Sequence, residues 1–261
     1  MKFFFKYTVV NFLLFLKNLF LAPFSKLARH RLSNAFFVLN YPFFGDNYKH
    51  LSEFLKKDEL QVTIAPVKSR QHNTTAFELL AICSLLKDNE CNEVFEIGTF
   101  DGRTARAMAM NLLNAQGEIF TLNLQPETDT VKLDTSIVDV QLARKVMSGE
   151  RFINTPEHKN IKQLWGDSAT YDFSTYYNKM DMVFIDGAHS EHYVKCDTEN
   201  GLKLIKQSGG IIIWHDAHLY GVVKYLKPWR NNNKLPLYFI KETSLAAARV
   251  KNGSVVDFFI N

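Results

Sequence analysis

Residues 93–104 read EVFEIGTFDGRT, an apolar run followed by a turn that contains two glycines. The run Glu93–Ile97 predicts a short buried strand, and residues Thr104–Leu113 predict a helix. Gly98 and Gly102 let the backbone between them turn sharply and pass close to a ligand. In an open parallel sheet, such a turn lies at the carboxyl ends of the strands, where ligands bind. This segment therefore predicts both a fold class and the place of a binding site.

The strand–helix alternation continues along the chain. Further strands are predicted at Glu118–Leu124, Ile161–Trp165, Met180–Ile185 and Ile211–Trp214, and further helices at Ala76–Leu86, Asp139–Ser148 and Glu191–Lys206. This alternation predicts a parallel sheet that is covered on both faces. The tail has little helical pattern and predicts antiparallel edge strands at Leu237–Lys241, Leu245–Val250 and Val255–Ile260. The predicted fold class is therefore α/β, Rossmann-like and mostly parallel.

Length, cysteine content and charge limit the classes of protein that fit this chain. Its 261 residues accommodate an N-terminal extension, residues 1–65, and one α/β domain, residues 66–261. The three cysteines form no Cys-x-x-Cys pair, which predicts free thiols in a reducing compartment and a cytoplasmic protein. A net charge of +4, mixed along the chain, argues against a nucleic-acid partner.

Residues 1–24 stand apart because they are very rich in Phe and Leu. Their longest uncharged stretch, Tyr7–Leu16, has ten residues, well short of the roughly 20 that a membrane-spanning helix needs. Lys17 and Asn18 interrupt the apolar run, and no convincing cleavage site of a secretory signal follows it. Two interpretations stay open: an interfacial membrane helix, or a helix packed on the domain or in a homo-oligomer contact.

Polar residues near the ends of the first three sheet strands form one group of candidate binding residues. The turn after the first strand contributes Glu96, Gly98, Thr99, Asp101 and Gly102. Its acidic-x-Gly-x-x-x-Gly spacing differs from the dinucleotide fingerprint. The looser loop suits S-adenosylmethionine, which has no pyrophosphate and whose cationic amino group calls for a carboxylate such as Glu96. Asn123 can bind ribose hydroxyls, and Asp167 and Ser168 can meet an adenine; for each of these alone, a loop-capping role is an equal alternative.

A second group follows the next two strands, in the segments Asp186-Gly187-Ala188-His189 and Trp214-His215-Asp216. Asp186, His189, His215 and Asp216 are the candidate catalytic residues. Asp186, Asp216 and His215 are also candidate ligands of a divalent cation. Carboxylates suit Mg²⁺, whereas His215 would suit a softer metal. An imidazole of this group can instead act as a general base, and the sequence leaves these alternatives open, together with a simple hydrogen-bonded His–Asp pair.

With these residues in place, the chain resembles the bacterial class I methyltransferases of the methyltransferase domain 24 family. The resemblance covers about residues 65–250 and is carried by VFEIGTFDGRTAR (94–106), TLNL (121–124), GERF (149–152), LWGDSATYDF (164–173), MDMVFIDGAHSEHYVK (180–195), GGIIIWHD (209–216) and TSLA (243–246). The Asp-Gly-Ala-His and Trp-His-Asp segments in register are far more specific than the glycine loop.

The resemblance implies a seven-stranded sheet whose last strand is antiparallel, with S-adenosylmethionine bound above the first four strands. It implies that Glu96, Gly98 and Gly102 form the cofactor loop, and that Asp167 meets the adenine. Asn123 stands where family members usually carry an Asp. Related sugar and small-molecule O-methyltransferases hold a divalent metal at the positions of Asp186 and Asp216, with a third acid where this chain has His215.

The expected function is transfer of a methyl group from S-adenosylmethionine to a hydroxyl of a small molecule or glycan. Because a neutral hydroxyl is a poor nucleophile, a base or a metal must assist. The acceptor pocket is expected in loops at His72–Thr74, Gln125–Arg151 and Leu219–Trp229. The rival hypotheses are a metal-dependent hydrolase and a non-catalytic membrane-associated module. A nicotinamide dehydrogenase is disfavoured because this chain lacks the Gly-x-Gly-x-x-Gly fingerprint of such enzymes.

Overall fold

The computed structural model describes residues 16–21, 47–65, 68–127, 131–145, 147–231 and 236–259. Most of the apolar segment 1–24 lies outside these ranges, and so do residues 22–46, so their predicted roles are not addressed by the structure. Within the segment, residues 16–21 are helical, and Leu19 and Phe20 are exposed. Among the described residues, no helix is both long enough and apolar enough to cross a bilayer.

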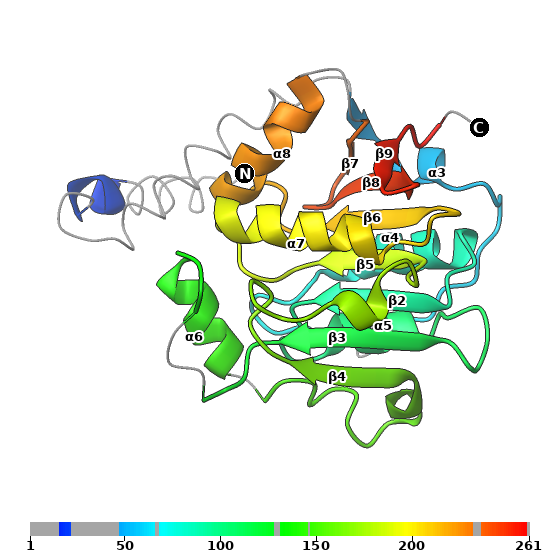
Figure 1. Ribbon diagram of the computed structural model, residues 1–261, viewed down its shortest axis with the longest axis horizontal. Helices are drawn as coiled ribbons and strands as arrows, with labels where there is room; N and C mark the ends of the chain where they lie inside the picture. Colours follow the sequence, from blue (N-terminus) through cyan, green and yellow to red (C-terminus); the bar gives the residue numbers. More distant parts are fainter. Residues whose placement is uncertain are drawn as a thin grey trace, which may run out of the picture.

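A nine-stranded mixed sheet forms the centre of the molecule, with strand order β1-β7-β8-β6-β5-β2-β3-β4 and β9 paired to β8 (Figure 1). Its parallel strands are β2 (Glu93–Ile97), β3 (Glu118–Asn123), β4 (Ile161–Trp165), β5 (Met182–Ile185) and β6 (Gly210–Trp214). The chain runs from β2 outward to β4 and then returns to β5 on the other side of β2. The strand order therefore reverses between β2 and β5, and such a reversal opens a crevice at the carboxyl ends of the strands.

The antiparallel part of the sheet lies beyond β6. Strand β8 (Ala246–Lys251) pairs antiparallel with β6, with β7 (Tyr238–Ile240) and with β9 (Ser254–Val256). The predicted Rossmann-like sheet with an antiparallel closing strand is confirmed. The strand predicted at Val255–Ile260 is present as the short β9, and β1 (Tyr48–Lys49), which pairs parallel with β7, was not predicted; these two strands exceed the seven that the resemblance implies.

Alternate side chains of the central strands enter two separate hydrophobic layers. Phe95 of β2 and Val183 of β5 pack with the layer of α7 (Glu191–Leu204) and α8 (Tyr220–Asn231). Their neighbours Val94 and Met182 pack instead with α4 (Ala76–Asp88) and α5 (Arg103–Ala109). Figure 1 shows α7 in front of the sheet and α4 behind it. Because both faces are covered, the two central strands β5 and β6 are continuous apolar runs.

The remaining helices are short or flank this core: α3 (Leu51–Phe54), α6 (Ile137–Lys145) and the 3₁₀ turns Pro156–Asn160 and Ser174–Tyr176. Helix α4, predicted at Ala76–Leu86, begins with a capping box: the Thr75 hydroxyl accepts the Glu78 N–H and the Glu78 carboxylate accepts the Thr75 N–H. One local prediction is wrong. The stretch Leu219–Trp229, expected as a loop, lies mostly in α8, where apolar residues such as Leu226 pack on the sheet.

Candidate active site

A cavity of about 580 Å³ lies at the carboxyl ends of β2 to β6. Gly98, Asn123 and Asp167 contribute to its wall on the side of β2, β3 and β4. Asp186, His189, His215 and Asp216, which we call the acid–imidazole cluster, contribute on the side of β5 and β6. The structure therefore brings the two groups of candidate residues into one hollow. Residues of α6, including Val138 and Leu142, add an apolar wall.

The two glycines of the first turn are required by contacts within the protein. Gly98 adopts a φ of 101°, and a Cβ atom there would lie 2.1 Å from the carbonyl oxygen of Asp186. Gly102 has a φ of 84°, and a Cβ atom there would lie 2.6 Å from the ring of Phe152. Of the two, only Gly98 lines the cavity. The glycine at position 98 thus lets the β2 turn pass directly against the end of β5.

Three polar residues predicted to bind the cofactor lie outside the cavity lining, as Gly102 does. The buried Glu96 carboxylate accepts a hydrogen bond from the Thr121 hydroxyl, and burial raises its pKa well above the usual value. Thr99 shares a 2.7 Å hydrogen bond with Thr121. Asp101 is fully buried and its Oδ2 lies 2.5 Å from Nε of Arg151. These three side chains stabilise the turn from beneath, and a direct contact between them and a cofactor stays a prediction.

Asn123, Asp167 and Ser168 all line the cavity, as expected of residues that contact a nucleoside. Among the described residues, Nδ2 of Asn123 is buried without a hydrogen-bond partner. Asp167 is well bound by the protein: it accepts from the Lys132 N–H at 2.7 Å and from the Tyr193 hydroxyl at 2.9 Å. Tyr193 also lines the cavity and was missed, because from sequence it is one of several apolar-face residues of α7.

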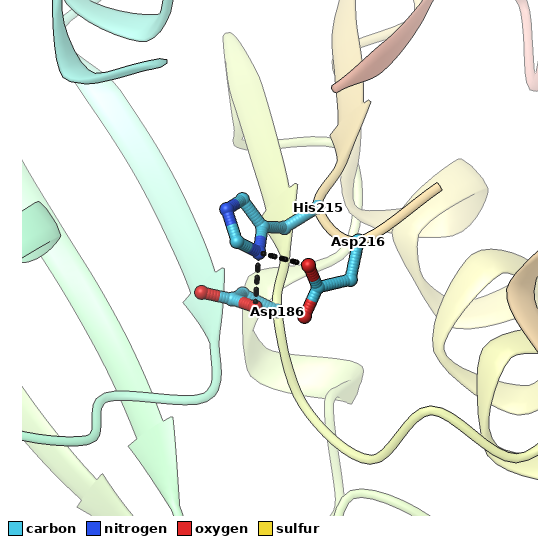
Figure 2. A group of neighbouring side chains, drawn as sticks. All are labelled: Asp186, His215 and Asp216. Atoms are coloured by element: carbon cyan, nitrogen blue, oxygen red, sulfur yellow. Dashed lines mark ion pairs between the residues drawn. The ribbon is translucent and has the colours of Figure 1, made fainter. Parts of the chain in front are cut away.

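The acid–imidazole cluster is compact. Nδ1 of His215 lies 3.1 Å from Oδ1 of Asp186 and 3.6 Å from Oδ1 of Asp216, and Figure 2 shows this nitrogen turned toward both carboxylates. Nε2 of His189 lies 3.2 Å from Oδ2 of Asp216. Asp216 itself adopts a φ of 49°, a backbone conformation that non-glycine residues seldom adopt and that often marks functional turns.

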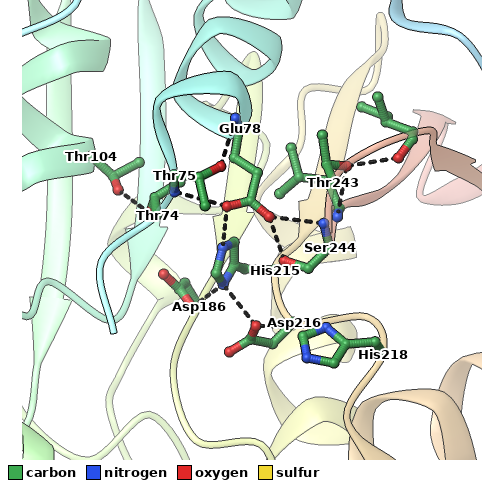
Figure 3. Close-up of polar contacts among 12 residues, drawn as sticks. Thr74, Thr75, Glu78, Thr104, Asp186, His215, Asp216, His218, Thr243 and Ser244 are labelled. Atoms are coloured by element: carbon green, nitrogen blue, oxygen red, sulfur yellow. Dashed lines mark hydrogen bonds and ion pairs between the residues drawn. The ribbon is translucent and has the colours of Figure 1, made fainter. Parts of the chain in front are cut away.

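Two further carboxylates stand behind the two imidazoles, and both were missed as site residues. Oε2 of Glu78 lies 3.4 Å from Nε2 of His215, as Figure 3 shows, and Oδ1 of Asp139 lies 3.1 Å from Nδ1 of His189. Glu78 also fills the capping box of α4, which by itself explains a glutamate at that position. Asp139 fell in a charged helical insert, and nothing in the sequence pattern links it to His189, 50 residues further on.

These contacts set the charge state of the cluster. Desolvation alone would lower the pKa of His215, but the facing carboxylates of Asp186 and Asp216 raise it well above its usual value. Desolvation likewise opposes the charge on His189, yet Asp139 and Asp216 raise its pKa. Burial would raise the pKa of Asp216, and the neighbouring imidazoles hold it well below the ordinary range. Without a bound ligand, the cluster is therefore an array of ion pairs.

The same residues have the donor chemistry of a cation site. Asp186, His215 and Asp216 each offer one ligand atom, and these atoms lie within 4.8 Å of one another. His215 is buried, and its Nδ1 makes no hydrogen bond within the described part of the chain. An orphaned buried nitrogen beside two carboxylates is the pattern that a bound cation would satisfy. The residues therefore fit the divalent metal that was considered from the sequence.

Comparison with known protein families gives a match for the central part of the chain. The model of a family described as a methyltransferase domain matches residues 95–217. That range begins within β2, continues past the end of β6 and contains the whole acid–imidazole cluster. No curated protein matches the chain.

Several solved structures are similar to the chain at low identity. An O-methyltransferase from Bacillus cereus in complex with S-adenosylhomocysteine is 17% identical, covering 70% of this chain and 84% of its own, with a TM-score of 0.48. A methyltransferase from Podospora anserina bound to the same compound is 15% identical, covering 69% and 79%, with a TM-score of 0.49. An O-methyltransferase of tomaymycin synthesis from Streptomyces achromogenes is 14% identical, covering 85% and 98%, with a TM-score of 0.46.

Proposed function

We propose that this chain is a class I S-adenosylmethionine-dependent methyltransferase and that it methylates a hydroxyl oxygen of a small molecule or glycan. The observation that carries the proposal is the single cavity shared by Gly98, Asn123 and Asp167 on one wall and by the acid–imidazole cluster on the other. A donor bound against the first wall would direct its methyl group toward an acceptor held by the second. The reaction needs this alignment and removal of one proton, and little else from the protein.

The wall formed by β2, β3 and β4 suits the nucleoside part of the donor. The unpartnered Nδ2 of Asn123 can donate to a ribose hydroxyl. Asp167 is oriented by Tyr193 and by the N–H of Ala169, so its remaining acceptor capacity faces the cavity where an adenine amino group would lie. The apolar residues of α6 that line the cavity can cover the flat face of the base.

The opposite wall suits removal of the acceptor proton. Bound S-adenosylmethionine supplies the electrophilic methyl carbon, and its sulfur keeps the bonding electron pair when the new O–CH₃ bond forms. Asp139 accepts from Nδ1 of His189, so Nε2 of the same ring is presented to the cavity. That nitrogen would take the hydroxyl proton as general base once the ring has lost the proton that it shares with Asp216 in the unliganded cluster. Asp186, His215 and Asp216 would hold a divalent cation, which would polarise the hydroxyl oxygen and fix its position.

The proposal also covers the cellular location of the enzyme and its partners. The free thiols Cys83, Cys91 and Cys196 are compatible with a cytoplasmic protein, and the apolar N-terminal segment would provide a peripheral membrane contact or a homo-oligomer contact. The acceptor remains a small molecule or glycan, and no nucleic-acid partner is proposed.

Calorimetric titration with S-adenosylmethionine and S-adenosylhomocysteine tests the proposal, followed by a methyl-transfer screen over glycans, phenols and carboxylates. We expect both nucleosides to bind and a hydroxyl acceptor to be methylated. Absence of binding by either nucleoside would remove the proposal. Hydrolysis of an ester without nucleoside binding would support the rival metal-dependent hydrolase, for which the acid–imidazole cluster alone would suffice. Full activity in the presence of a chelator would remove the metal from the mechanism and leave the His189 base.

A further inference from the structure

The metal part of the proposed function can be sharpened from the surroundings of His215. Its side chain is only 8% exposed, and neither ring nitrogen has an aligned hydrogen bond within the described residues. Nevertheless Nδ1 lies 3.1 Å from Asp186 and 3.6 Å from Asp216. Three potential ligand atoms thus lie close together, and the imidazole nitrogen among them has no aligned hydrogen bond in the ranges that the structure describes. Groups that share a bound cation are arranged in this way.

Glu78 determines which nitrogen of the ring faces that partner. Its Oε2 lies 3.4 Å from Nε2 of His215 and accepts the Thr75 N–H at 2.8 Å. Its Oε1 accepts the N–H and the hydroxyl of Ser244 at 2.8 and 2.6 Å. Figure 3 shows the carboxylate held between these groups, so it cannot swing away. With a cation bound in place of the Nδ1 proton, the fixed negative charge of Glu78 would hold the remaining proton on Nε2 and leave the lone pair of Nδ1 for the metal.

This ligand chemistry is not that of a magnesium site. Mg²⁺ prefers oxygen ligands and keeps several waters, whereas imidazole nitrogen suits the first-row transition metals. A carboxylate that orients a ligating imidazole is the usual outer shell of such metals. We infer that Asp186, His215 and Asp216 bind a divalent transition metal of the Mn²⁺, Co²⁺ and Zn²⁺ class in preference to Mg²⁺, with Glu78 as the positioning residue behind His215. The inference deepens the proposed function but can be measured without a methyl donor or acceptor.

The test is titration of chelator-treated, dialysed full-length protein with Co²⁺, followed by its visible absorption, with Mn²⁺, Zn²⁺ and Mg²⁺ as competitors. We expect one equivalent of Co²⁺ to bind, Zn²⁺ to displace it readily, Mn²⁺ to displace it less readily, and Mg²⁺ to compete poorly. Because transition metals bind most sites better than Mg²⁺ does, the decisive comparison is His215→Asp, which makes all three side chains carboxylates. In this variant the preference for Co²⁺ over Mg²⁺ should fall by on the order of tenfold.

Glu78→Gln keeps the shape of the side chain and should weaken Co²⁺ binding by roughly 10–100-fold. The control is His192→Gln, because His192 is exposed on α7 and outside the cavity lining. Far-UV circular dichroism and thermal melting report whether each variant folds. Asp216→Asn, at a more accessible ligand position, removes one charged ligand and should strongly weaken Co²⁺ binding, so it tests the ligand set if His215→Asp is unfolded.

Three outcomes would overturn the inference: no Co²⁺ binding to wild type, equal competition by Mg²⁺, or unchanged metal preference in folded His215→Asp. S-adenosylhomocysteine binding by the same metal-free samples keeps the two proposals apart. Nucleoside binding without Co²⁺ binding would refute the metal assignment alone. Co²⁺ binding without nucleoside binding would refute the methyltransferase proposal and leave the metal site standing.

Discussion

The two walls of the cavity differ in how well the protein satisfies its own polar groups. Beneath and along the β2–β4 wall, carboxylates are bound internally: Glu96 by Thr121, Asp101 by Arg151, and Asp167 by Tyr193. In the acid–imidazole cluster, by contrast, Nε2 of His189 and both ring nitrogens of His215 are buried without a hydrogen bond among the described residues.

The difference indicates that the β2–β4 wall has a mainly structural and binding role, whereas the acid–imidazole cluster takes part in the proposed reaction. A wall whose polar groups are already satisfied is preorganised and needs no ligand to hold its shape. A cluster whose buried nitrogens face carboxylates without aligned hydrogen bonds gains stability when a cation or a polar substrate binds. We therefore expect substitutions in the first wall to act through geometry or binding, and substitutions in the second to act on chemistry.

The largest effect is expected where the two walls meet. Gly98→Ala would place a methyl group 2.1 Å from the Asp186 carbonyl oxygen, so the β2 turn and the end of β5 must separate. We expect loss of S-adenosylhomocysteine binding, measured by calorimetry, and a decrease in the free energy of unfolding of about 3 kcal/mol or more.

The matched control for this change is Gly253→Ala. Gly253 also has a positive φ, of 68°, but nothing lies within 4 Å of a Cβ atom there. Its substitution carries only the backbone penalty, about 1–2 kcal/mol, and nucleoside binding should be retained. Equal effects of the two substitutions on binding would show that the junction of the walls is not what Gly98 provides.

A smaller effect, confined to turnover, is expected at Asp139. Asp139→Asn keeps a hydrogen-bonding side chain near His189 but removes the charge that orients and stabilises the ring. We expect kcat to fall on the order of 10–100-fold while the Kd for S-adenosylhomocysteine stays unchanged. The control is Gln141→Ala, at an exposed position of the same helix. A parallel loss of nucleoside affinity would mean that Asp139 holds α6 in place and has no role in positioning the base.

The sequence predicted the residues that line the cavity better than it predicted the residues that orient them. Strand-end residues such as Asp186 and His215 could be placed together, because parallel strands end at a common edge. Glu78 and Asp139 could not, because they reach the site from helices whose docking depends on packing far from them in sequence. For the same reason Asp101 was predicted to face the cofactor. Its orientation is set by Arg151, 50 residues away, and no local pattern reports that ion pair.

Asp197 on α7 is a buried polar residue that lacks a hydrogen-bond partner within the described part of the chain but is not one of the proposed catalytic residues. Both of its carboxylate oxygens are buried without a partner among the described residues, yet it lies outside the cavity lining. Burial raises its pKa to about 7. Because the folded-state pKa exceeds the unfolded value, its favourable contribution is complete at low pH and is lost as pH rises toward 7.

Asp197→Asn removes this penalty, so the variant should gain stability over wild type as pH rises. Between pH 5 and pH 8 the gain should grow by about 2–3 kcal/mol, measured by chemical unfolding at each pH. If the difference in unfolding free energy between the two proteins does not change with pH, the pKa of Asp197 is not raised in the folded protein, and a hydrogen-bond donor or a cation stabilises its carboxylate.

The smallest effect is expected at Asn123, which is the exception in the well-satisfied wall. Its orphaned Nδ2 predicts one hydrogen bond to the ligand, and one such bond contributes about 1 kcal/mol. Asn123→Ala should therefore weaken S-adenosylhomocysteine binding by roughly three- to tenfold. Asn123→Asp should bind at least as tightly as wild type, because a carboxylate accepts from both ribose hydroxyls in charge-assisted bonds. If alanine binds as well as asparagine, Nδ2 faces no ligand, and the β3 end is scaffold like the rest of its wall.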